Sequence, residues 1–142
     1  MKALFLIAQI AGRGVAIEST QVDSVVDMGE AIAVPRTTSA VRGLAALRSR
    51  VVTVIDPAIM LGMPPTTAGR SRAVISLIDG HCYAFLVDAL EDVELFVRQP
   101  LSTGMVVDGP WRRAGRGIIE RDGEPLLILD LTALLPPVTQ AA

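Results

Sequence analysis

Residues 47–62, "LRSRVVTVIDPAIMLG", indicate the fold class of this chain. The run over 50–55 is rich in valine and isoleucine, as buried strands are, and it ends at Asp56 followed by Pro57. Aspartate before proline is a favoured helix start, because the carboxylate accepts an unpaired amide while proline lacks one. The stretch therefore predicts a strand over 50–55, an N-cap at Asp56 and about one turn of helix with Leu61 facing inward.

The same pattern returns near the end of the chain, where residues 125–135 read "PLLILDLTALL". An apolar strand again runs into an aspartate, Asp130, and then into a short helical turn with Leu134 or Leu135 on its inner side. This weak internal repeat predicts that the chain is built from two similar halves.

The remaining chain predicts a mostly β fold, since short apolar runs recur between turn residues at roughly ten-residue spacing. Asp79-Gly80 and Asp122-Gly123 predict type I′ hairpin turns, and Gly12-Arg13-Gly14 predicts a third hairpin. Further strands are expected near 24–32, 44–47 and 92–97. The stretch 63–72, "MPPTTAGRSR", is expected to be the exposed connection between the halves.

Composition limits the domain organisation and the classes of partner. The chain has 142 residues, 51% of them hydrophobic, and a net charge of −2. We expect one compact domain over 1–137 with a flexible tail at 138–142. No apolar run reaches the roughly 20 residues of a membrane span, the N-terminus lacks a cleavage site, and the single cysteine fits a reducing compartment, so we expect a cytoplasmic protein. With 4% aromatic residues and no basic excess, nucleic acid is not an expected partner.

Residues that could carry catalysis lack the partners they would need. Asp56 has the position of a receiver-type phosphoacceptor, but phosphoryl transfer needs a Mg²⁺ held by further carboxylates and a nearby cation. The only lysine is Lys2, and no acidic pair follows the first strand. His81 and Cys82 are neighbours in a predicted strand, so their side chains point to opposite faces. We predict no catalytic residue, metal site or cofactor.

Arg48 and Arg50 flank a tight turn within an apolar stretch. A guanidinium group offers five donors in a planar fork, which suits it equally to bracing the carbonyls of a turn and to anchoring a partner. Both roles for Arg48 stay open at this point.

Several blocks of the chain resemble, in order and spacing, the motifs of the chemotaxis coupling proteins, the CheW-like family. Residues 41–64, "VRGLAALRSRVVTVIDPAIMLGMP", resemble the family signature G-V-I-N-L-R-G-x-x-x-P-V-I-D-L-x-x-x-L-G-L-P. Residues 15–27 look like its V-x-E-V segment, residues 73–93 like the hairpin with G-L-L-V-D-x-V, and residues 117–135 like the closing D-G-x-x-x-x-L-L-D-L-x-x-L. The resemblance covers roughly residues 3 to 135.

The resemblance implies a fold and a role without catalysis. The fold would be two side-by-side five-stranded SH3-like β-barrels with short helices. The protein would be an adaptor, recruited to membrane receptor arrays, that links the cytoplasmic helical hairpin of chemoreceptors to the regulatory domain of a CheA-type histidine kinase. Kinase-contact residues are left unassigned. The implied receptor-binding residues are Val22, Val25, Gly43, Leu44, Leu47 and Arg48.

The chain departs from the family pattern at four positions of these motifs. It has Ser24 for the glutamate of V-x-E-V, Ala46 for asparagine, Ser49 for the turn glycine and Thr53 for proline. These departures leave open a divergent CheW-like binding module of a non-chemotactic pathway that retains one partner. The position of Asp56 leaves a second alternative, a receiver-type phosphoacceptor at that residue.

Overall fold

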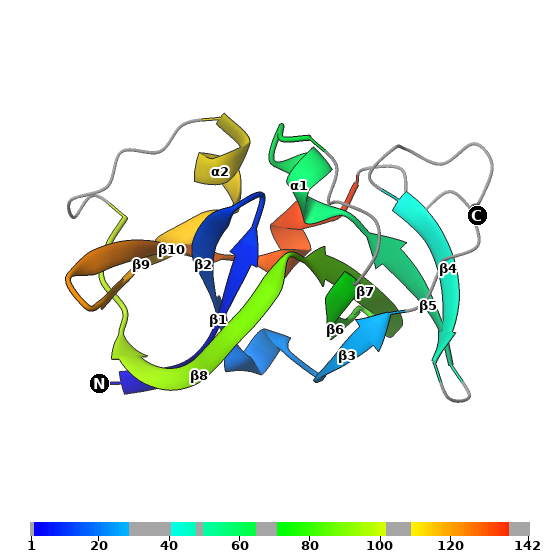
Figure 1. Cartoon of the computed structure of the whole chain (residues 1–142), viewed down its shortest axis with the longest axis horizontal. Coiled ribbons are helices and arrows are strands. Elements are labelled where there is room, and N and C mark those ends of the chain that lie inside the picture. Colours follow the sequence, from blue (N-terminus) through cyan, green and yellow to red (C-terminus); the bar gives the residue numbers. More distant parts are fainter. Residues whose placement is uncertain (1, 29–40, 48–49, 65–70, 102–108, 137–142) are drawn as a thin grey trace.

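The computed structural model describes residues 2–28, 41–47, 50–64, 71–101 and 109–136 of the chain. Ten strands form two five-stranded sheets that lie side by side (Figure 1). The first barrel has the strand order β8-β1-β2-β10-β9, with bounds Ala89–Val97, Lys2–Ile10, Arg13–Glu18, Glu124–Leu129 and Gly115–Arg121. The second barrel has the order β3-β6-β7-β5-β4, with bounds Ser24–Met28, Ser71–Ile78, His81–Val87, Arg50–Ile55 and Val41–Leu47. The predicted fold class is confirmed.

Within the described ranges, four short helical segments join these strands. The helices α1 and α2 lie side by side along the top in Figure 1, and two 3-10 turns, η1 and η2, follow β2 and β10. Their bounds are Pro57–Met60 for α1, Gly109–Ala114 for α2, Ser19–Gln21 for η1 and Leu131–Leu134 for η2. No helix among the described residues is long and apolar enough to cross a membrane.

The two barrels repeat one topology, which is the internal repeat that the sequence predicts. In each sheet one pair of neighbouring strands is parallel, β10 with β2 in the first barrel and β5 with β7 in the second. The other neighbouring strands in each sheet are antiparallel. In each barrel one strand of the parallel pair leads into a capped turn: β5 leads into α1, and β10 leads into η2. The first barrel differs because the N-terminal β1 and β2 join the C-terminal β8, β9 and β10.

A bridge outside the named strands closes the first barrel. The Gln99 amide donates to the Ile118 carbonyl at 2.8 Å, and the Ile118 amide donates to the Gln99 carbonyl at 2.9 Å. Gln99 follows β8 and Ile118 lies in β9, so the two edge strands of the first sheet meet there.

Three apolar cores result, one inside each barrel and one between them. Alternate residues of a strand face opposite sides of a sheet, so β1 contributes Phe5 and Ile7 to the interior of the first barrel and Leu6 and Ala8 to the core between the barrels. The inter-barrel core is the largest and includes Leu61, Leu134 and Trp111 from the helical segments. The two barrels therefore share their main hydrophobic core.

The predicted hairpins form, with one shift in position. Positive φ angles occur at both residues of Asp79-Gly80 and of Asp122-Gly123, as type I′ turns require. The third turn is made by Ala11 and Gly12 rather than by residues 12–14. Gly14 belongs to β2, where a Cβ would lie 3.1 Å from Leu126 Cδ2.

The prediction that residues 63–72 connect the two halves is wrong. The elements on either side of this stretch, β5 with α1 and then β6, belong to the second barrel. The chain passes between the barrels at residues 19–23, between β2 and β3, and again at Asp88, between β7 and β8.

Candidate partner-binding surface

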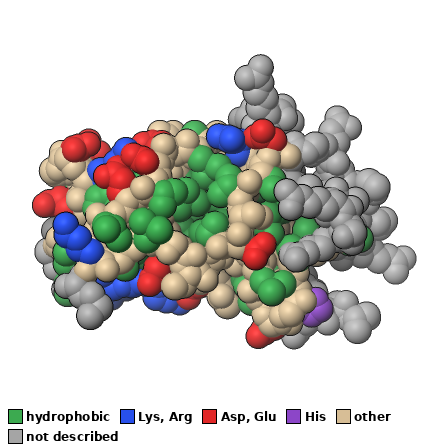
Figure 2. Space-filling model, turned by 90° about the horizontal axis from the view of Figure 1, so that it is seen from below, with side chains coloured by type: hydrophobic (Ala, Val, Ile, Leu, Met, Phe, Trp, Pro, Cys, Tyr) green, Lys and Arg blue, Asp and Glu red, His purple; other side chains and the backbone are tan. Residues whose placement is uncertain are grey.

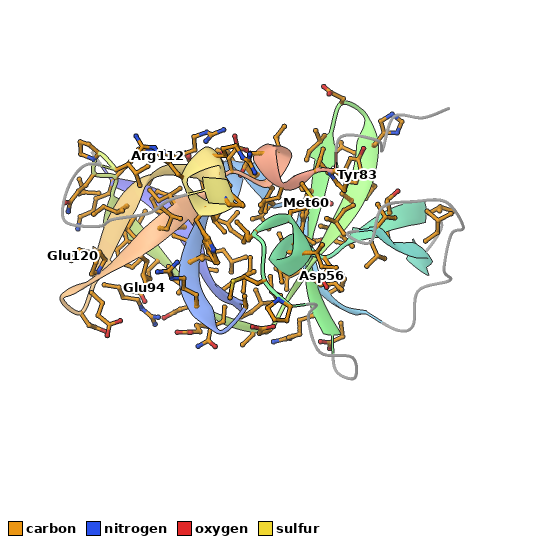
Figure 3. The ribbon with its side chains drawn as sticks, turned by 90° about the horizontal axis from the view of Figure 1, so that it is seen from above. Asp56, Met60, Tyr83, Glu94, Arg112 and Glu120 are labelled. Atoms are coloured by element: carbon orange, nitrogen blue, oxygen red, sulfur yellow. The ribbon has the colours of Figure 1, made fainter. Side chains whose placement is uncertain are left out.

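The two aspartates at the strand ends are helix caps. Asp56 is completely buried, and its Oδ1 accepts a hydrogen bond from the Ala58 amide at 3.2 Å, with Pro57 as the first helical residue. Asp130 Oδ1 accepts from the Thr132 amide at 3.0 Å. The predicted caps are confirmed, and Figure 3 shows Asp56 at the base of α1. A carboxylate with no solvent exposure is out of reach of a phosphoryl donor, which disfavours the receiver-type alternative.

The leucines of the two capped turns face inward as predicted, and the side chains of His81 and Cys82 lie on opposite faces of their strand. Leu61 and Leu134 are buried in the inter-barrel core, and Leu135 only packs against it. His81 is exposed, while Cys82 packs against the interior of the second barrel. Within the described part of the chain, no group of three or more histidine, cysteine, aspartate or glutamate residues could hold a metal ion.

Two of the predicted receptor-binding residues lie at the start of the second barrel. Val22 follows η1 and packs against the inter-barrel core. Val25 lies in β3 opposite Val74, a residue of that core, so its side chain is on the outer face of the sheet, where 38% of it is exposed.

Three of the other predicted residues, Gly43, Leu44 and Leu47, belong to β4. Leu44 pairs with Thr53 and is exposed on the outer face, because Val52 and Val54 on either side of Thr53 face the barrel interior. Gly43 pairs with Val54, so its position is on the inner face. Leu47 ends β4, and Arg48 lies outside the described residues. The structure thus places Val25 on β3 and Gly43, Leu44 and Leu47 on β4, the two edges of one sheet, with Val22 just before β3.

An apolar surface on the first barrel was not predicted. Leu4 pairs with Leu95 across β1 and β8, and these two share the outer face with Val93 and Val97. Their exposed fractions are 40% for Leu4, 51% for Val93, 59% for Leu95 and 47% for Val97. We call these four residues the β1–β8 apolar surface. The alternation of exposed valines and leucines over 93–97 was the available signal, but it does not show which face a neighbouring barrel covers.

This surface begins where the two barrels meet. Val93 lies directly opposite Leu6, and Leu6 belongs to the inter-barrel core against which Val22 also packs. β3 and β8 both lie along the lower side of the molecule in Figure 1. Figure 2, which looks at this side, shows hydrophobic side chains gathered across its middle. Contiguous exposed apolar residues can mark a site of protein association.

A charged cluster lies on the same barrel, around Arg121 of β9. Arg121 Nη1 donates to Glu91 Oε1 at 2.7 Å, and Arg121 Nε lies 3.7 Å from Glu94 Oε2. The Arg121 hydrogen bond, together with one from Gln9, lowers the pKa of Glu91. A hydrogen bond with Asp92 instead raises the pKa of Glu94, because the two carboxyl groups share a site.

An open hollow of about 260 Å³ adjoins this cluster. Its lining residues are Ile7, Gln9, Gly14, Glu91, Arg121, Asp122, Glu124 and Leu126. Glu91, one of the acidic residues of the lining, accepts hydrogen bonds from both Arg121 and Gln9, so these contacts tie β1, β8 and β9 together.

Comparison with known proteins identifies the family. The family profile described as "CheW-like domain" matches residues 4–138. This chain belongs to the CheW-like domain family. It is 21% identical over 131 residues to the chemotaxis protein CheW of Thermotoga maritima. This match covers 92% of this chain and 86% of that protein. Its fold is similar to the crystal structure of the scaffolding protein TtCheW from Thermoanaerobacter tengcongensis, with a TM-score of 0.81 and 22% identity over 96% of this chain and 89% of that chain.

Proposed function

We propose that this chain is a non-catalytic scaffold of chemotaxis signalling that couples the cytoplasmic helical hairpin of chemoreceptors to the regulatory domain of a CheA-type histidine kinase. Membership of the CheW-like family supports this role, as do its similarities to a chemotaxis protein and to a scaffolding protein. In this role the protein is cytoplasmic and is recruited to receptor arrays. Because both barrels share one main core, we propose that residues 1–137 act as one unit.

The observation that carries the proposal is the exposed apolar surface on either side of the barrel junction. A helix that docks onto a protein presents an apolar stripe at i, i+3, i+4 and i+7 and needs a matching apolar surface. Val25 on β3 and the four residues of the β1–β8 apolar surface supply such contacts. Charged residues flank both: Lys2 lies opposite Val97, and Asp27 follows Val25 on the same face of β3. Val22 packs against the core between them and would support both sides of the receptor contact.

The receptor contact is tested by titration calorimetry with a soluble helical hairpin that carries the cytoplasmic tip of a chemoreceptor from the same organism. Val25→Glu and Val93→Glu place a charge on exposed positions, so the fold should survive while the Kd for the hairpin rises about tenfold or more. Leu77→Glu is the control, because Leu77 is an exposed apolar residue on β6 that pairs with Cys82 and so shares the inner face of the second barrel, whereas Val25 and Val93 lie on outer faces. Equal affinity of all three variants and the original protein would contradict the assignment.

Arg48 is tested against its neighbour Arg50. An anchoring Arg48 predicts that Arg48→Ala lowers hairpin affinity by about 2 kcal/mol with an unchanged melting temperature. A turn-bracing Arg48 predicts a lower melting temperature instead, because carbonyls lose their donor at about 1–3 kcal/mol. Arg50→Ala should change neither quantity. If Arg48→Ala also changes neither, Arg48 is not part of the site.

The kinase contact is tested by titration with the kinase's regulatory domain and by co-elution on a sizing column. A complex with both partners supports the coupling role. Binding of one partner alone would favour the alternative of a CheW-like module of a different pathway, and Ser24, Ala46, Ser49 and Thr53 would then be the first positions to restore to the family pattern. The absence of both complexes would refute the proposed function.

A further inference from the structure

The segment that first carries the chain from one barrel to the other is held at both ends by side chains of the first barrel. β2 ends at Glu18, η1 covers Ser19–Gln21, and β3 begins at Ser24. Glu18 and Gln21, at the two ends of this passage, each bind groups that lie 80 or more residues further along the chain. We call these contacts the linker clamp.

Gln21 makes the contacts at the second-barrel end of the clamp. Its Nε2 donates to Asp130 Oδ1 at 2.7 Å, and its Oε1 accepts from the Leu131 amide at 3.0 Å. The side-chain amide therefore engages the cap of η2 as both donor and acceptor. The site is partly buried, so both hydrogen bonds are shielded from competing water.

Glu18 makes the contact at the first-barrel end, and the two ends are connected. Arg98 Nη2 donates to Glu18 Oε1, and Arg98 Nη1 donates to the Arg116 carbonyl at 3.0 Å. The Arg116 side chain in turn lies 3.3 Å from Asp130 Oδ2, the carboxylate that Gln21 also binds. The groups that hold Glu18 and Gln21 thus lie near strand ends: Arg98 follows β8, Arg116 is near the start of β9, and Asp130 follows β10.

The residues that follow the clamp begin the proposed receptor contact. Val22 packs against the inter-barrel core directly after Gln21, and the Asp23 amide donates to the Ile75 carbonyl at 2.7 Å to start the pairing of β3 with β6. The position of Gln21 therefore sets where β3, with Val25, begins relative to β8.

We infer that Gln21 is a positioning residue for the partner surface: it fixes the β3 side of the barrel junction against the first barrel, so that Val22 and Val25 lie in register with the β1–β8 apolar surface. This inference rests on the proposed function, since it deepens the assignment of that same surface.

Gln21→Glu is the decisive substitution, because it keeps the shape of the side chain and changes one contact. The new carboxylate still accepts from the Leu131 amide, but it faces Asp130 where Gln21 donates. Arg116 on β9 is the charged group that also contacts the Asp130 carboxylate. The other charged groups on the neighbouring elements are the Glu18–Arg98 pair, Asp23 after η1 and Lys2, the one titratable residue of β1. Two carboxylates in hydrogen-bond contact raise each other's affinity for a proton, so the contact re-forms as the pH falls.

The experiment measures binding of the receptor-tip hairpin to the original protein and to Gln21→Glu at pH 7.5 and pH 5. The expected Kd of the variant is about tenfold higher than that of the original protein at pH 7.5, and the ratio is smaller at pH 5, because a proton shared between the two carboxyl groups replaces the lost donor. Gln21→Ala loses both hydrogen bonds and should bind weakly at both pH values.

Gln9→Glu is the matched control. Gln9 Nε2 donates to Glu91 Oε2 at 2.7 Å, so this variant creates the same carboxylate contact between two strands of the first barrel, β1 and β8. It should leave hairpin affinity within about twofold at both pH values.

A second readout does not need the partner. Spin labels on Leu77→Cys and Glu120→Cys, exposed positions on different barrels, report the distance between the barrels in a Cys82→Ser background. Gln21→Glu should broaden the distance distribution at pH 7.5 and narrow it at pH 5.

The possible outcomes separate this inference from the proposed function. Weaker, acid-reversible binding with a broadened distribution supports it. Unchanged binding and distances in Gln21→Glu overturn it, as does an equal loss of binding in Gln9→Glu. If the original protein does not bind the hairpin, the proposed function fails, and the distance distribution alone decides: broadening supports the clamp, and no broadening overturns it.

Discussion

The two capped turns, α1 after β5 and η2 after β10, come from nearly the same sequence pattern and have different surroundings. The Asp56 carboxylate has no solvent exposure, whereas the Asp130 side chain is 24% exposed and also binds Gln21 and Arg116. The turn at Asp56 leads into β6 of the same barrel, while the turn at Asp130 lies beside the passage from one barrel to the other. The same motif thus caps a helix within one barrel at Asp56, whereas at Asp130 it also contacts the segment that connects the two barrels.

The largest expected effect concerns what the two turns share. Leu61 and Leu134 are both buried in the inter-barrel core, so Leu61→Ala and Leu134→Ala should each lower the free energy of unfolding by about 3 kcal/mol. Urea denaturation measures both values. A difference between them of more than about 2 kcal/mol would show that the two turns are not equivalent in packing.

The next effect is the loss of the buried cap. Asp56→Ala leaves the Ala58 amide unpaired where water does not reach it, so we expect a loss of about 2 kcal/mol in the free energy of unfolding. Hairpin affinity of the folded variant should stay the same. Unchanged stability with abolished partner binding would instead assign a direct role to Asp56.

A smaller loss in stability with a larger loss in binding is expected at the other cap. Asp130→Ala removes the bond to the Thr132 amide at a site that water partly reaches, at about 1 kcal/mol. It also removes the acceptor of Gln21, so hairpin affinity should fall together with stability. Calorimetric titration beside urea denaturation tests this, and an affinity equal to that of Asp56→Ala would remove the distinction between the two caps.

The smallest effects come from ion pairs on the surfaces of the two barrels. The pKa of Glu91 is lowered in the fold, chiefly by Arg121, so its stabilising contribution is present above the ordinary carboxyl pKa and is lost as the pH falls through the folded-state value. Glu91→Gln should therefore be slightly less stable at pH 7 and equal to the original protein in acid, as melting temperatures across pH would show.

The control for this pair lies on the second barrel. Arg72 and Asp27 form a pair at 3.0 Å, but their side chains are 47% and 81% exposed. Asp27→Asn should not change the melting temperature at any pH, because exposed pairs are screened by water and contribute little. A larger effect of Asp27→Asn than of Glu91→Gln would contradict this ranking.

The sequence by itself determined the local features of this protein. Strand alternation, the Asp-Gly turns at 79–80 and 122–123 and the caps at Asp56 and Asp130 depend on residues a few positions apart, and they form as predicted. The ordered motif blocks also sufficed to indicate the family. Even the repeat of the two halves was visible, because each copy carries its own strand, aspartate and turn.

Only the tertiary structure decided which strands share a barrel and which faces stay exposed. The first barrel joins β2 to β10 through two paired positions, Val15 with Leu127 and Ala16 with Ile128, and no local signal specifies a pairing over 112 residues. For the same reason the sequence predicts a connection at residues 63–72 that the structure does not have, and it does not predict the linker clamp or the β1–β8 apolar surface. A turn is specified by the chain on either side of it, whereas a contact between distant segments depends on how the whole sheet closes.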